Sequence, residues 1–67
     1  MTEYMKANIT TNTFTVGGGR FIGSEKGTIA FCSMKQLERI IAESKKAALD
    51  KHNLDIDIII DSIEPLD

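Results

Sequence analysis

The sequence predicts one small α+β domain, with a three- to four-stranded, mainly antiparallel sheet and one amphipathic helix packed on one face, in the order β-(β)-β-α-β. Three observations carry this prediction. Residues 8–16 are rich in β-branched side chains, residues 34–52 repeat apolar side chains at a helical period, and residues 54–63 alternate isoleucine with aspartate. The 67 residues allow a single domain over residues 1–67, with a thin core.

The N-terminal half is expected to form two or three strands. We expect residues 1–7 to be frayed and residues 8–16 to form a strand with Phe14 and Val16 toward the core. Three glycines end that strand, residues 23–27 have the composition of a turn, and residues 28–32 form a further strand. Residues 20–22 are either a short middle strand of a meander or part of a long hairpin loop over residues 17–26. The meander is favoured, because loops near ten residues are uncommon.

The helix has clear signals at both ends. Ser33 and Gln36 fit a capping box, in which the serine caps the first turn and the glutamine reaches back to a free backbone N–H. Asn53 can adopt the left-handed conformation that ends a helix. Leu37, Ile40 and Ile41 begin the apolar stripe, so the helix is expected to cover the sheet with this side.

The last strand is expected over residues 54–63, with Pro65 ending it and residues 64–67 forming an acidic tail. Two strand orders stay open: this strand lies parallel beside residues 28–32, or it pairs beside the first strand. The expected core draws on all elements and comprises Leu37, Ile40, Ile41, Phe14, Phe31, Ile56, Ile58 and Ile60.

Charge is unevenly distributed along the chain. Residues 1–49 have a net charge of +3 (seven Lys/Arg, four Asp/Glu), whereas residues 50–67 have a net charge of −5 (one Lys, six Asp/Glu). This pattern is typical of a solvated acidic strand face, and it is also the pattern of a surface that binds a basic protein. The candidate partner-binding residues are Asp55, Asp57, Asp61, Glu64 and Asp67.

Enzymatic chemistry is not expected. Cys32 and His52 are the only cysteine and histidine, so a disulfide within the chain and a Cys/His zinc site are excluded. The two residues flank the predicted helix, about 28 Å apart along it, which is too far for a thiolate–imidazole pair. Cys32 is expected to be a small buried residue, and the aspartates of the last strand to protect a sheet edge rather than bind a metal. We therefore expect no catalytic residues, no metal and no cofactor.

The glycine-rich segment provides a second candidate site. Gly17, Gly18, Gly19 and Arg20 could hold a phosphate group or a nucleotide through backbone N–H groups and a guanidinium. The segment lacks the following helix of a dinucleotide fingerprint and the Lys-Ser/Thr of a P-loop, so a simple turn is the favoured interpretation. Nucleic acid binding is not favoured, because acidic side chains interrupt the basic helix face and no aromatic platform accompanies it.

These features favour a small cytoplasmic protein that works by binding. From the sequence we expect neither a signal peptide nor a membrane-spanning segment, and a single cysteine fits a reducing compartment. Ile59 and Ile63 break the alternation of the last strand, which predicts a homodimer or a partner that covers them. The expected function is that of an inhibitor or adaptor of a larger protein with a basic surface. By size alone it is comparable to phage and mobile-element inhibitors, including anti-CRISPR proteins. The alternative is an oligomer that sequesters a nucleotide or another phosphate-containing ligand.

Overall fold

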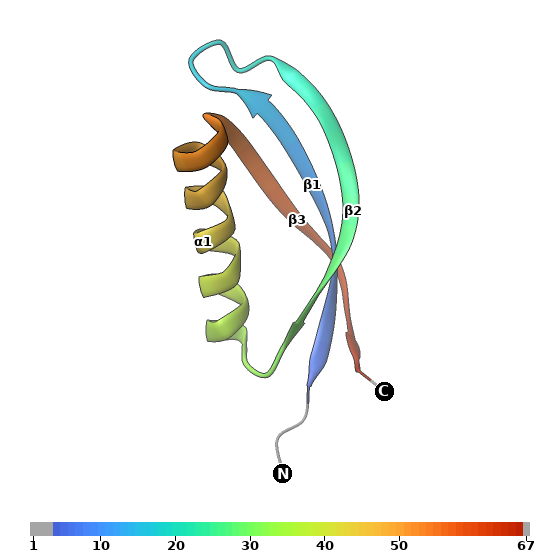
Figure 1. Cartoon of the computed structure of the whole chain (residues 1–67). Coiled ribbons are helices and arrows are strands. Elements are labelled where there is room, and N and C mark those ends of the chain that lie inside the picture. The colour runs from blue at the N-terminus through green and yellow to red at the C-terminus, as the bar shows by residue number, and fades with distance from the viewer. Residues whose placement is uncertain (1–3, 67) are drawn as a thin grey trace.

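The computed structural model describes residues 4–66 and confirms the α+β class. The elements are β1 (Met5–Thr15), β2 (Phe21–Phe31), α1 (Met34–His52) and β3 (Leu54–Pro65). The three strands form one antiparallel sheet in the order β2-β1-β3, so β1 is central and β3 pairs beside it. Of the two orders that the sequence allows, the structure therefore has the second. The helix covers one face of the sheet (Figure 1).

The N-terminal half is a single long hairpin and not a meander. The predicted turn at residues 23–27 is wrong, because this segment lies inside β2 and pairs without interruption with residues 9–13 of β1. The hairpin turns at residues 16–20, where the Thr15 N–H donates to the Arg20 carbonyl at 2.8 Å. Val16 is accordingly an exposed loop residue, not a core residue. Gly17 and Gly19 have φ values of 88° and 66°, a left-handed conformation that glycine adopts without strain.

The first strand starts earlier than predicted. Residues 5–7, expected to be frayed, pair with both neighbouring strands, and the Ala7 side chain is fully buried. Residues 1–3 lie outside the described residues. The segment is ordered because β3 continues to Pro65 and so provides a second ladder of hydrogen bonds for the start of β1.

Both helix ends form as the sequence predicts, with one difference. The Ser33 hydroxyl accepts a hydrogen bond from the Gln36 N–H at 3.1 Å, and Asn53 ends the helix at φ 52° and ψ 44°. The Gln36 side chain accepts from the Cys32 N–H at 2.7 Å, one residue before the expected partner. Both ends of the helix are therefore fixed by side chains or backbone of the chain itself.

The core is small and lies between the first turns of α1 and one end of the sheet. Its buried residues are Ala7, Ile9, Phe31 and Leu37, with Met5, Ile29, Ile41 and Ile58 packed against them. Four of the eight predicted core residues lie outside this cluster: Phe14 is on the face away from the helix, Ile60 is 37% exposed, and Ile40 and Ile56 are only half-buried.

The molecule is elongated, with extents of 45 × 19 × 13 Å, and it exposes 4994 Å² of surface. A compact folded monomer of 7.4 kDa is expected to expose about 4,200 Å². Ten large apolar side chains are at least 37% exposed. The fold thus leaves uncovered an apolar surface that a chain of this size ordinarily buries.

Candidate functional site

The face of the sheet opposite the helix, here called the outer face, holds most of the predicted partner-binding residues. Cross-strand partners project to the same side of a sheet, so the pairing of β3 with β1 sets this face. Asp55 is paired with Phe14, and Asp57 with Asn12. Both aspartates are exposed, and neither forms an ion pair or a side-chain hydrogen bond with another described residue. Their carboxylates are therefore free to meet a partner.

The other two described carboxylates of β3 are already engaged within the domain. Asp61 accepts a hydrogen bond from the Thr10 hydroxyl at 2.6 Å. Glu64 accepts from the Asn8 amide at 2.7 Å and lies 3.8 Å from the Lys6 ammonium. The structure thus divides the predicted acidic site: Glu64 and Asp61 are bonded to β1, whereas Asp55 and Asp57 keep carboxylates without a partner among the described residues. Asp67 lies outside the described residues.

Ile59 and Ile63 do not share a face, which corrects the expected interface. Ile9 is paired with Ile60, yet the preceding residue, Asn8, is paired with Ser62, so Asp61 is an extra residue in β3. Such a β-bulge shifts the alternation of side chains by one. Ile59 therefore stays on the outer face among the aspartates, while Ile63 lies on the helix face beside Ile60. Ile59, Ile60 and Ile63 are 45%, 37% and 38% exposed.

We call the outer-face row of Asp55, Asp57, Ile59 and Asp61 the acidic face of β3. It combines three carboxylates with one exposed apolar side chain on an edge strand, whose outer backbone groups have no partner within the sheet. The position of Ile59 could be read from the sequence. The bulge that separates it from Ile63 could not, because nothing in the sequence of β3 shows which of its residues is left unpaired against β1.

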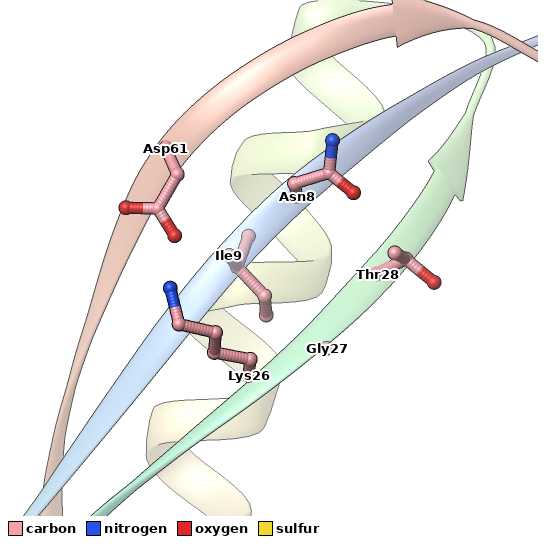
Figure 2. Close-up of a pocket in the computed structure, with 6 residues that line it drawn as sticks. All are labelled: Asn8, Ile9, Lys26, Gly27, Thr28 and Asp61. Carbon is pink, nitrogen blue, oxygen red and sulfur yellow. The ribbon is translucent and has the colours of Figure 1, made fainter.

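An open hollow of about 420 Å³ lies at the middle of the sheet. Figure 2 shows the helix behind the strands, with the Lys26 side chain extending over β1 toward Asp61. The hollow brings together one base, one carboxylate and two neutral polar groups, a combination that the sequence did not predict because the residues come from three strands. It is lined by Asn8, Ile9, Lys26, Gly27, Thr28 and Asp61.

The candidate anion-binding segment, Gly17 to Arg20, forms a hairpin turn. Two of its four backbone N–H groups already donate hydrogen bonds within the chain. The Gly19 N–H donates to the Thr15 carbonyl at 3.1 Å, and the Arg20 N–H donates to the Thr15 hydroxyl at 3.0 Å. Only Gly17 and Gly18 keep amide groups outside these bonds, and all four candidate residues are exposed. This geometry favours the turn interpretation, and the nucleotide alternative stays a prediction.

Cys32 is exposed and not buried as expected, because it follows the last residue of β2 at the turn into α1. Its thiol donates to the Gln36 side chain at 3.0 Å. Cys32 and His52 lie at opposite ends of α1. Among residues 4–66, no group of three or more metal-ligating side chains comes together.

The helix α1 is not apolar enough to cross a membrane, and it is the only helix in the part of the chain that the structure describes. Comparison of the chain with models of known protein families, with curated proteins and with solved structures gives no match.

Proposed function

We propose that this chain is a small non-enzymatic protein-binding module that docks the acidic face of β3 on a basic surface of a larger protein. The observation that carries the proposal is the combination of exposed carboxylates and exposed apolar side chains on one edge strand. Asp55 and Asp57 have no partner among the described residues, and Ile59 lies directly beside them.

The composition of this surface fits a protein interface better than a solvated strand. Protein interfaces place apolar side chains at the centre and polar groups at the rim. Ile59 lies between Asp57 and Asp61 along β3, and Ile60 is exposed on the opposite face of the same edge. The aspartates would select a basic partner and speed its approach, whereas Ile59 would supply buried apolar area at the centre of the contact.

The role proposed for this module is that of an inhibitor or adaptor, which acts by covering or bridging a surface of its partner. Phage-encoded inhibitors, including anti-CRISPR proteins, share this size class and are one setting for such a role. We place the interaction in the cytoplasm, where the exposed thiol of Cys32 would stay reduced.

The test is affinity capture of a stoichiometric partner, followed by kinetics with paired variants. Asp55→Asn combined with Asp57→Asn removes two charges without changing side-chain shape. The matched control is Glu38→Gln combined with Glu43→Gln, which removes two exposed carboxylates from the helix. We expect the aspartate pair alone to slow association and to flatten its salt dependence, because screening acts over about 8 Å at physiological ionic strength.

The nucleotide alternative is tested in the same experiment. Arg20→Ala should leave partner binding intact. ATP should bind neither the wild-type chain nor the Arg20→Ala variant. If the aspartate variant binds like the wild type while Arg20→Ala fails to bind, the acidic docking surface is wrong and the loop takes its place.

A further inference from the structure

A row of three side chains crosses the outer face at the end of the sheet where β1 turns into β2. Phe14 of β1 is paired with Asp55 of β3 on one side and with Phe21 of β2 on the other. Paired residues project to the same face of a sheet, and the helix covers the opposite face (Figure 1). The row therefore presents one carboxylate and two aromatic rings on the uncovered side of the sheet.

The two rings support each other and stay accessible. The ring centroids of Phe14 and Phe21 lie 5.7 Å apart, with their planes at 65°, in an edge-to-face contact. Phe14 is half-buried, whereas Phe21 is 56% exposed, more than any other large apolar side chain among residues 4–66. The face of an exposed aromatic ring attracts a cation. This end of the outer face thus offers a fixed aromatic surface to a positively charged group.

The carboxylate beside these rings has no partner within the described part of the chain. Asp55 is exposed and forms neither an ion pair nor a side-chain hydrogen bond there. The base nearest to the row, Arg20, forms no ion pair with a described residue, and its backbone N–H donates to the Thr15 hydroxyl. Asp57 follows on the same face, roughly 7 Å along β3, and adds a second free carboxylate. The row is therefore open to a cation from outside the chain.

We propose that Asp55, Phe14 and Phe21 form the binding site for an arginine side chain of the basic partner. This inference rests on the proposed function and names the residue of the partner that the outer face holds. The guanidinium donates two parallel hydrogen bonds to the Asp55 carboxylate and stacks its plane on the aromatic pair. A lysine ammonium is a compact, strongly hydrated charge that offers neither the fork nor the plane, so the site selects arginine.

The spacing of the strands lets one guanidinium make both contacts. Neighbouring strands lie about 4.8 Å apart, which places Asp55 and Phe21 roughly 10 Å from each other with Phe14 between them. A guanidinium about 2.8 Å from the carboxylate oxygens would lie above Phe14, inside the distance of about 6 Å at which a ring attracts a cation.

The other exposed aromatic side chain among residues 4–66 lacks this arrangement. Tyr4 precedes β1 at the opposite end of the sheet, and its backbone carbonyl is bonded to Leu66 of the neighbouring segment. The nearest carboxylate of β3 there, Glu64, is already bonded to Asn8 and paired with Lys6. Tyr4 is therefore the matched aromatic control for the row.

Binding of two peptides of equal length and charge, nona-arginine and nona-lysine, tests the site by calorimetry. The wild-type chain should bind nona-arginine about two- to five-fold more tightly than nona-lysine, the gain expected for cation–π contact at an exposed ring. Phe14→Leu combined with Phe21→Leu should abolish this preference, and Tyr4→Leu should keep it. Asp55→Asn should also abolish it, whereas Asp57→Asn, which removes the same charge from the same face, should weaken both peptides alike. Circular dichroism checks that each variant folds.

The outcomes separate this site from the acidic docking surface as a whole. Equal binding of the two peptides, or a preference that the phenylalanine pair does not affect, overturns the arginine site and leaves the docking surface standing. Binding of neither peptide overturns both. Self-association that Arg20→Ala abolishes also overturns the proposal, since Arg20 of a second copy would then fill the site.

Proton NMR of the wild-type chain gives the same test without a substitution. The ring resonances of Phe14 and Phe21 should shift on addition of nona-arginine and stay in place on addition of nona-lysine, while those of Tyr4 respond to neither. Rings that do not respond to nona-arginine, or that respond equally to both peptides, refute the stacking on which the proposal depends.

Discussion

Deletion of Asp61 is the sharpest test of how β3 places its side chains. Asp61 is the extra residue of the bulge, so its removal should leave Ile60 opposite Ile9 and Ile63 opposite Ala7, now in a regular ladder. What is lost is one exposed hydrogen bond to Thr10, worth about 1 kcal/mol. We therefore expect the free energy of unfolding to fall by no more than about 1 kcal/mol, a shift in Tm of about 4–8 °C or less.

Deletion of Ile60 gives a chain of the same length, but it should destabilise the domain more than deletion of Asp61. The carboxylate of Asp61 would then take the place opposite Ile9 on the helix face. Ile60 is 37% exposed, so its loss costs about 1–2 kcal/mol. A carboxylate against the core adds about 1–3 kcal/mol. The total of about 2–5 kcal/mol is a large part of the stability of a domain this small.

Urea unfolding followed by circular dichroism measures both deletions under the same conditions. Similar losses for the two chains, or a milder effect for deletion of Ile60, would refute the assignment of the bulge and with it the separation of Ile59 from Ile63.

Three further predictions concern the helix, the core and the outer face. Ser33→Ala should lower stability by about 1 kcal/mol in a thermal melt, since it removes the N-cap bond, and an unchanged Tm would contradict that cap. Leu37→Ala should cost about 2–5 kcal/mol in urea unfolding because Leu37 is fully buried, whereas Leu49→Ala, at a residue 49% exposed, should be nearly neutral. Phe14 and Phe21 pack edge to face at 5.7 Å, so a double-mutant cycle to leucine should give a coupling of about 0.5–1.5 kcal/mol, and additive losses would contradict it.

The helix was predictable because its signals are local. Ser33, Gln36 and Asn53 act on backbone groups within a few residues of themselves, so their roles can be read from the sequence alone. The class of the fold follows from the same local patterns. The acidic face of β3 was also partly predictable, since Asp55, Asp57 and Ile59 alternate in a regular strand.

What could not be predicted depends on pairing between distant segments. Gly23 and Gly27 favour a turn by composition, but the ladder with β1 satisfies their backbone groups and holds the segment extended. Likewise Ile63 joins the helix face only because the bulge at Asp61 shifts the alternation. The hollow lined by Asn8, Lys26 and Asp61 combines three strands, and no short-range pattern connects them.

The strand order also determines when the sheet can be completed during synthesis. The central strand β1 is made first, whereas β3, one of its two neighbours, is made last, and their paired residues lie up to 60 positions apart, as between Met5 and Pro65. The hairpin of β1 and β2 can form early, but one side of β1 stays without a partner until β3 has been made. The start of β1 and the end of β3 lie at the same end of the molecule, where the Leu66 N–H donates to the Tyr4 carbonyl at 3.1 Å (Figure 1). A circular permutant that joins these ends and opens at Gly18 would make the pairing of β3 with β1 local, and it should fold faster than the natural chain.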